Sequence, residues 1–217
     1  MHPNPTFRQT DRDTALALVR ARSFGTLVLS TEGAPLLAHV PFLLSESGTE
    51  ADLHLVRSNP IARACAAPQP VTLAVSGPDG YISPDWYGIE DQVPTWNYVA
   101  VHLTGQLHPC PLAELEPLLA AQSAAYEGRL PGKSPWTMDK MSAETKARFL
   151  RMILPFRLEI GEVQSTFKLG QNKPEEVRLA AADKDFKENA PLDAARETQG
   201  KAEARIRELE ETLRHAV

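Results

Sequence analysis

A segment of alternating polarity, VPTWNYVAVHLTG from Val93 to Gly105, constrains the fold of this chain more than any other feature. Successive side chains of an extended strand point to opposite faces of a sheet. One face of the predicted strand is apolar and belongs to a core: Val99, Val101 and Leu103. The other face is polar and aromatic: Tyr98, Ala100, His102 and Thr104. That second face is either a solvated sheet surface or the wall of a site for a flat, hydrogen-bonding ligand.

The predicted strand continues to His108, and five other segments have the composition and turn boundaries of strands. They are Phe24 to Ser30, Pro35 to Ser45, Asp52 to Ser58, Val71 to Gly77, and Phe156 to Leu169 with Leu158, Ile160 and Val163 as core candidates. The first two form a predicted hairpin, and the turn Gly77-Pro78-Asp79-Gly80 is expected to end the fourth strand. Many strands at short spacing with inserted helices predict a mainly β chain, an antiparallel sheet or barrel in an α+β setting.

Four helices are expected between these strands. They run from Thr10 to Arg22, from Asn59 to Pro68, from Pro111 to Gly128 and from Ser142 to Met152. Thr10 and Asp13 have the spacing of a capping box, and Leu16 and Val19 lie on the predicted buried side. Pro117 is expected to kink its helix or delay its start.

Composition excludes several classes of function. The chain has 217 residues, of which 42% are hydrophobic, enough for one good core. No apolar run approaches the roughly 18 residues of a membrane span, so we expect a cytoplasmic protein. The net charge of -5, without a basic cluster, disfavours direct nucleic-acid binding. Cys65 and Cys110 are expected to be small buried hydrophobes, and no cluster has metal-ligand spacing.

Two polar groups could bind an anion. Arg57, Ser58 and Asn59 leave a strand and enter a helix with Pro at its first position, which suits a phosphate. Alternatively, Ser58 or Asn59 caps the helix and Arg57 is solvated. The second group follows the last strand and could bond a phosphate or the amide edge of a ring, or could simply be solvated: Lys168, Gln171, Asn172 and Lys173.

Two other parts of the chain carry weaker signals. Exposed aromatic residues between Gly77 and Gly88 would cover a cavity or an interface, or would hold a long loop to the core. There is no Gly-rich phosphate loop and no Ser elbow, and His39, His54 and His102 stand alone on separate strands. The C-terminal residues Ala202, Ile206, Leu209, Leu213 and Ala216 form a narrow apolar seam at helical spacing. This helix packs on its own domain or pairs with a partner subunit.

Seven motifs, in this order, resemble the PaiB-type family of FMN-binding negative transcriptional regulators. They are FGTLV at 24, AHVPFLL at 38, HLVRSNP at 54, GPDGYISPDWY at 77, VPTWNYVAVHLTG at 93, SPW at 134 and KLGQNKP at 168. The resemblance runs from about Pro3 to about Pro174. It implies a six-stranded split β-barrel of the flavin-reductase and pyridoxamine-phosphate-oxidase type, with peripheral helices. It also implies a homodimer with FMN in the cleft between subunits.

The resemblance also implies roles for single residues. Arg57, Ser58 and Asn59 would meet the phosphate of FMN. Lys168, Gln171 and Asn172 would approach the phosphate or the ring edge. The ring or its surroundings would be lined by Trp96, Asn97, Tyr98 and His102. Lys173 stands where an Arg is usual in the family, so the charge is kept without the planar fork.

We therefore expect an FMN-binding domain over residues 1–174 and a helical C-terminal extension over 175–217. The expected function is that of a flavin-binding, PaiB-like regulator. An FMN-dependent oxidoreductase or flavin reductase of unknown substrate is the alternative. A repressor that binds DNA directly is disfavoured by the acidic balance and by the lack of a helix-turn-helix pattern.

Overall fold

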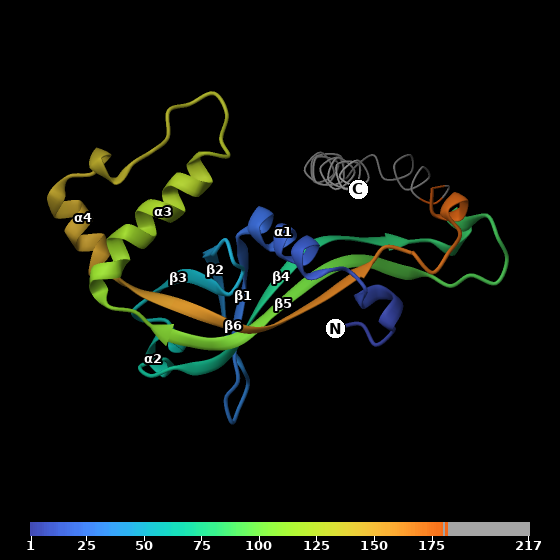
Figure 1. Cartoon of the computed structure of the whole chain (residues 1–217), viewed down its shortest axis with the longest axis horizontal. Coiled ribbons are helices and arrows are strands. Elements are labelled where there is room, and N and C mark those ends of the chain that lie inside the picture. Colours follow the sequence, from blue (N-terminus) through green and yellow to red (C-terminus); the bar gives the residue numbers. More distant parts are fainter. Residues whose placement is uncertain (180, 182–217) are drawn as a thin grey trace. The chain divides into compact units, whose positions relative to one another are not determined.

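A computed structural model describes residues 1–179 and 181, and its core is a closed six-stranded barrel in the order β1-β2-β3-β6-β5-β4 (Figure 1). The strands are β1 (Phe24–Leu29), β2 (Leu36–Leu44), β3 (Glu50–Val56), β4 (Gln69–Ile82), β5 (Thr95–Pro109) and β6 (Ile153–Lys168). β1 pairs antiparallel with β2 and β4, and β3 pairs antiparallel with β2 and β6. The predicted mainly β, six-stranded barrel is confirmed.

The chain divides into two compact units. The barrel unit comprises Met1, Thr10–Ser76 and Ala100–Ser165. The second unit comprises His2–Gln9, Gly77–Val99 and the described residues from Thr166 onward. β4, β5 and β6 each contribute residues to both units.

The core of the barrel unit follows the alternation of its strands, because inward side chains occupy every second position. β1, β3 and the first half of β4 alternate strictly between buried and more exposed residues. On β5, Val101 and Leu103 have no exposed surface, as the alternating segment predicted. On β6, Leu158 is buried as expected, Ile160 and Val163 are only half-buried, and the core also takes in Phe156.

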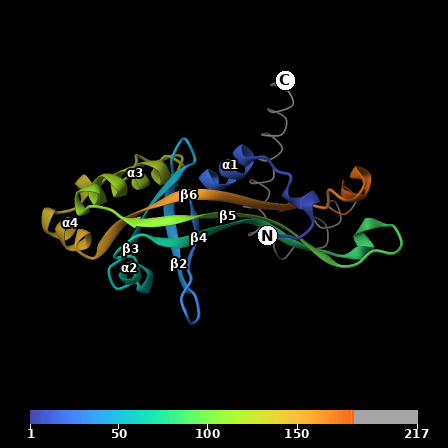
Figure 2. The same ribbon diagram turned by 60° about the horizontal axis from the view of Figure 1, so that its bottom comes forward.

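The helices belonging to the barrel unit begin where local chemistry places them. They are α1 (Arg12–Arg22), α2 (Pro60–Ala64), α3 (Leu115–Glu127) and α4 (Ala143–Leu150), with α3 and α4 visible in Figure 2. The prediction that Thr10 opens α1 is wrong, because the N-cap is Asp11, whose carboxylate accepts a hydrogen bond from Thr14 N. Leu16 and Val19 are buried as expected. Pro117 lies in the first turn of α3, where it delays the helix without breaking it.

Short 3-10 turns complete the described elements: Pro5–Arg8, Pro84–Tyr87, Leu112–Glu114 and Met138–Lys140. The predicted turn at Gly77-Pro78-Asp79-Gly80 is wrong, since β4 runs through it to Ile82. Gly77 and Gly80 have no positive φ, so their backbone stays extended. Gly77 is needed there because a Cβ at this position would lie 2.8 Å from Val99 Cβ on β5. Its glycine therefore allows the close approach of two strands.

Within residues 1–179 and 181, no helix is both long and apolar enough to span a bilayer. The predicted apolar seam from Ala202 to Ala216 lies outside the described residues.

Candidate functional site

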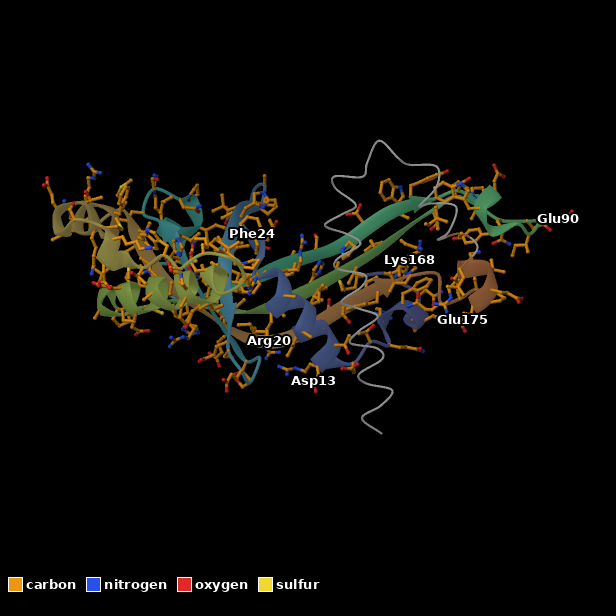
Figure 3. All side chains as sticks on the ribbon, turned by 90° about the horizontal axis from the view of Figure 1, so that it is seen from above. Asp13, Arg20, Phe24, Glu90, Lys168 and Glu175 are labelled. Carbon is orange, nitrogen blue, oxygen red and sulfur yellow. The ribbon has the colours of Figure 1, made fainter. Side chains whose placement is uncertain are left out.

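The end of β6 in the second unit places Lys168 among polar and aromatic groups, and Figure 3 labels Lys168 there together with Glu90 and Glu175. Lys168 Nζ donates to Thr95 Oγ1 and to the backbone oxygen of Trp96, the latter at 2.6 Å. The ring of Phe7 lies 6.0 Å from the same nitrogen. Burial lowers the pKa of Lys168, and the positive charge of Lys173 lowers this pKa further. An anion close to this ammonium group would relieve both effects.

Lys173 lies over a buried tyrosine in the same unit. Its Nζ is 4.2 Å from the centroid of the Tyr87 ring and donates to Gln92 Oε1. Among the described residues, neither Lys168 nor Lys173 forms a salt bridge. The second unit therefore carries two cationic groups whose charges are not compensated by a described carboxylate.

Three buried polar atoms of the second unit have no hydrogen-bond partner among the described residues: Tyr87 Oη, Asn97 Oδ1 and Arg178 Nε. A buried polar atom without a partner costs free energy, so such atoms often mark where a ligand binds. FMN has a ring N–H donor, ring carbonyl acceptors and a phosphate. The acceptor on Asn97, the donor on Arg178 and the two ammonium groups match these needs, so the residues present fit FMN.

Aromatic side chains add a surface for a flat ligand. Tyr81 and Trp96 meet edge to face with ring centroids 6.2 Å apart, and Trp96 is 56% exposed. Exposed aromatic rings of this kind bind planar molecules or protein partners. Tyr98, on the same strand, is half-buried.

The remaining residues of the KLGQNKP motif behave differently from one another. The side chain of Gln171 stabilises the turn that follows β6, since its Oε1 accepts from Leu169 N at 2.8 Å and its Nε2 donates to Phe167 O. Asn172 is exposed. The second unit thus gathers Trp96, Asn97 and Lys168, whereas Gln171 has its amide occupied by its own turn.

The predicted phosphate group Arg57, Ser58 and Asn59 belongs to the barrel unit. Arg57 Nε donates to Arg151 O at 2.7 Å, and the rest of this exposed guanidinium has no described partner. Asn59 Oδ1 caps α2 by accepting from Ile61 N at 2.9 Å. Asn59 therefore has the capping role that the sequence offered as the alternative, and its contact with a phosphate stays a prediction.

His102 lies on the part of β5 that belongs to the barrel unit and is half-buried. Burial lowers the pKa of its imidazole, which favours the neutral form. A neutral imidazole can both donate and accept a hydrogen bond.

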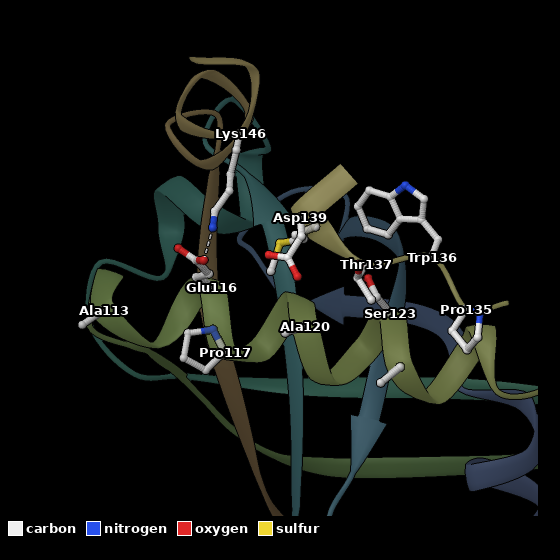
Figure 4. A pocket seen from close by; sticks show the side chains of 12 residues that line it. Ala113, Glu116, Pro117, Ala120, Ser123, Pro135, Trp136, Thr137, Asp139 and Lys146 are labelled. Carbon is white, nitrogen blue, oxygen red and sulfur yellow. Dashed lines mark ion pairs between the residues drawn. The ribbon is translucent and has the colours of Figure 1, made fainter. Parts of the chain in front are cut away.

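A pocket of about 610 Å³ lies in the barrel unit beside α3 (Figure 4). Its lining includes Trp136, Asp139 and an ion pair between Glu116 of α3 and Lys146 of α4. None of the ten predicted site residues lines it. Sequence reasoning noted Trp136 only as part of the SPW motif, because a pocket between a helix and a distant loop has no local pattern.

Sequence reasoning also missed two residues of the second unit. Tyr87 was visible only as one of several loop aromatics. Arg178 follows the last motif and carries no pattern of its own, so only the folded turn after Pro174 brings it to Gly170.

A six-stranded antiparallel barrel that carries cationic, amide and aromatic groups suited to a flavin defines the class of FMN-binding split-barrel proteins. The family model described as "Putative FMN-binding domain" matches residues 1–162. The chain belongs to this family, and the expected PaiB-type assignment is confirmed.

Individual relatives agree with this assignment. The "Protease synthase and sporulation protein PAI 2" of Bacillus subtilis is 32% identical over 171 residues, covering 78% of this chain and 81% of that protein. The FAD and heme binding protein of Mycobacterium smegmatis superposes with a TM-score of 0.55 at 20% identity, covering 81% of this chain and 80% of that one. This structural likeness concerns the fold.

The C-terminal residues match a different family. The model described as "Transcription elongation factor, N-terminal" matches residues 171–217. Transcription elongation factor GreA of Dehalococcoides mccartyi is 57% identical over 42 residues, which are 19% of this chain and 27% of that protein. The first family match ends at residue 162, within β6, and the second begins at residue 171, just after this strand.

Proposed function

We propose that this protein is a cytoplasmic, homodimeric, flavin-dependent regulator that binds FMN. Arg57, Ser58, Asn59 and His102 would contribute from the barrel unit. Trp96, Asn97, Tyr98, Lys168, Gln171 and Asn172 would contribute from the second unit. Bound FMN would supply electron-transfer chemistry, and the protein would supply binding and orientation.

The observation that carries this proposal is the unsatisfied acceptor on Asn97 beside the group around Lys168. Asn97 Oδ1 is buried without a described partner, and the ammonium group of Lys168 has a lowered pKa and no described carboxylate beside it. A flavin offers an N–H to the first and a negative charge or carbonyl to the second. Binding would therefore give Asn97 a hydrogen-bond donor and Lys168 a compensating charge.

The test is an FMN titration of the purified full chain, followed by flavin fluorescence and absorption. Saturable quenching with one FMN per chain is expected. Asn97→Ala should weaken binding, and Asn172→Ala, at an exposed position of the KLGQNKP motif, should weaken it less. FMN that stays free at all protein concentrations contradicts the proposal.

The dimer is supported by an exposed apolar surface on the β1–β2 hairpin. Phe24 is 54% and Leu37 60% exposed, and Phe24 stacks on His39 at 6.5 Å between ring centroids. These residues lie on the outer face of two paired strands. Exposed apolar side chains on one sheet face are typical of an interface.

A second candidate function belongs to residues 171–217, which we name the C-terminal segment. Its match to an elongation factor favours a role on the transcription machinery, through a protein partner. This agrees with the net charge of -5, which disfavours direct DNA binding. The test is co-purification of the full chain with core RNA polymerase, and absence of a complex at micromolar concentrations contradicts it.

The enzyme alternative is tested in the same preparation. NADH or NADPH is added to the FMN-loaded protein, and flavin bleaching is compared with an equal concentration of free FMN. A rate well above the free-FMN control favours an oxidoreductase, and an equal rate favours the regulator.

A further inference from the structure

The first residues of the C-terminal segment are folded into the second unit. Val177 and Ala181 are buried in one small hydrophobic cluster with Ile82, Trp86 and Tyr87. The backbone N–H groups of Val177 and Arg178 donate to Pro174 O at 3.1 and 3.2 Å, in the first turn of a helical stretch that begins at Glu175, directly after the KLGQNKP motif. We name residues 171–179 and 181 the tail root.

The tail root brings Arg178 to the candidate flavin site. Gly170 has φ 75°, and a Cβ built on it would lie 3.6 Å from Cγ and Cδ of Arg178 and 4.0 Å from Asn97 Nδ2. The stem of Arg178 and the amide of Asn97 therefore converge on one point above Gly170. A larger residue at position 170 would occupy that point and would be strained at this φ.

The two converging side chains carry complementary unpaired atoms. Arg178 Nε is a buried donor and Asn97 Oδ1 is a buried acceptor, and neither has a partner among the described residues. A ligand that satisfies both must present an acceptor to Arg178 and a donor to Asn97. A cyclic imide edge, a ring N–H flanked by carbonyl oxygens, has this pattern, and the flavin ring contains one.

We propose that Arg178 and Asn97 bind the imide edge of a flavin, and that flavin binding thereby fixes the tail root. This inference rests on the proposed FMN function and adds a binding residue that lies beyond the matched FMN-binding domain, which ends at residue 162. Arg178 belongs to the segment that resembles an elongation factor, so a partner that also fixes the tail root would be thermodynamically coupled to the flavin. Such coupling is reciprocal, so partner binding alters FMN affinity by the same factor.

The ligand arm of the test uses FMN, riboflavin, 3-methylriboflavin and uridine with the full chain. Riboflavin lacks the phosphate and keeps the imide edge, so Arg178→Gln should weaken FMN and riboflavin by the same factor, roughly 10-fold for one charge-assisted hydrogen bond. Methylation of the ring N–H should weaken binding to the wild type by a similar factor. A loss of affinity for FMN alone in Arg178→Gln would assign Arg178 to the phosphate and overturn the inference.

Uridine shares the imide edge with riboflavin and should bind far more weakly than riboflavin. Equal binding of the two would assign the site to pyrimidines instead of flavins and overturn the inference.

The coupling arm measures hydrogen exchange of the amides of Val177 and Arg178 in the full chain. Saturating FMN should slow this exchange about 5-fold or more, the lower end of typical coupling factors. Val177→Ala, which opens the small cluster, should reduce the FMN-induced protection. Leu179→Ala is the matched control, because Leu179 is 60% exposed on the same turn and should leave the protection intact.

The two proposals fail in different ways. FMN that binds the wild type without slowing exchange of the tail root overturns the coupling and leaves the FMN function standing. FMN that does not bind the wild type overturns both. If the amides of the tail root exchange faster in Arg178→Gln even without FMN, the Arg178→Lys variant separates folding from binding. Slow amide exchange restored without restored FMN affinity supports the imide contact. An Arg178→Lys variant that restores neither overturns it.

Discussion

At the scale of single residues, the candidate site depends on cations and amides that the fold leaves only partly satisfied. Lys168 bonds Thr95 and Trp96 O, yet burial and Lys173 still lower its pKa. A half-buried ammonium group with a lowered pKa would be stabilised by an anion or a carbonyl oxygen. The free energy available from such a contact decides whether a flavin site is tight or absent.

Lys168→Gln should therefore weaken FMN binding. A hydrogen bond to a charged group contributes about 1.5–3 kcal/mol, so the Kd should rise roughly 10- to 150-fold. Fluorescence titration measures the Kd for FMN. Lys140→Gln in the barrel unit is the control for a change of net charge. An unchanged Kd in Lys168→Gln would remove this residue from the site.

Substitution of Arg57 should have two separable effects, because its guanidinium group bonds the protein backbone and is also proposed to bind FMN. Its Nε donates to Arg151 O at 2.7 Å, so Arg57→Ala should lower the free energy of unfolding by about 0.5–1.5 kcal/mol even without flavin. If the remaining donors bind the FMN phosphate, FMN affinity should fall while riboflavin affinity does not. Denaturation curves and paired titrations measure the two effects.

Arg63→Ala is the control for Arg57, since Arg63 donates to Ser58 O at 2.9 Å from the neighbouring helix α2. It should reproduce a small loss of stability without selectivity between FMN and riboflavin. Equal losses for both ligands in Arg57→Ala would contradict the phosphate assignment of Arg57.

At the scale of elements, the strands were predictable because alternation is local. Val99, Val101 and Leu103 are buried as their spacing indicated, and Asn59 with Pro60 opens α2 as its local chemistry indicated. The error at Gly77 has the opposite cause. Gly-Pro-Asp-Gly favours a turn in isolation, but the close approach of Val99 keeps it in β4.

The candidate site was predictable only in part for the same reason. Motifs gave Lys168 and Asn97, which lie on strands with readable patterns. Arg178 and the cluster of Val177 and Ala181 with Tyr87 arise from packing between residues about 90 positions apart in the chain. No local pattern reports such contacts.

A polar contact joins α3 to β3 inside the barrel unit, and it makes stability depend on pH. His54 Nδ1 donates to Oε1 of the buried Gln122 at 3.0 Å, and Gln122 Nε2 donates to Asp52 O at 3.3 Å. Burial lowers the pKa of His54 from its ordinary 6.5, although the bond to Gln122 opposes this. The unfolded state therefore binds a proton at a higher pH than the folded state.

It follows that the contribution of His54 is complete above about pH 6.5 and is lost as pH falls through the lowered folded pKa. His54→Gln should flatten the loss of stability below pH 6.5, measured by urea denaturation at several pH values. Part of the slope should remain, because burial also lowers the pKa of His102. A His54→Gln variant that keeps the wild-type slope would contradict the prediction.

At the scale of the whole molecule, the chain joins a flavin-binding family domain to a segment that resembles an elongation factor. The second unit carries the junction, since the tail root packs there on Tyr87 and reaches Gly170. FMN bound at such a junction would contact residues of both family matches. Binding of FMN could therefore change the conformation of the tail root within one compact unit, as the regulator hypothesis requires.

The oligomeric state is the remaining property at this scale, and the β1–β2 hairpin provides its test. Phe24 and Leu37 project from the outer face of paired strands, and burying them against a second copy would remove apolar area from water, worth about 25 cal/mol per Å². Leu37→Glu would instead bury a charge at that interface, which is strongly unfavourable without a partner. We expect the wild type to have the mass of two chains by light scattering and Leu37→Glu to have the mass of one. Leu112→Glu, at a position 57% exposed just before α3, should remain dimeric.

If FMN lies between subunits, the monomeric variant Leu37→Glu should also lose FMN affinity. A folded monomer that binds FMN as tightly as the wild type would place the whole flavin site within one chain.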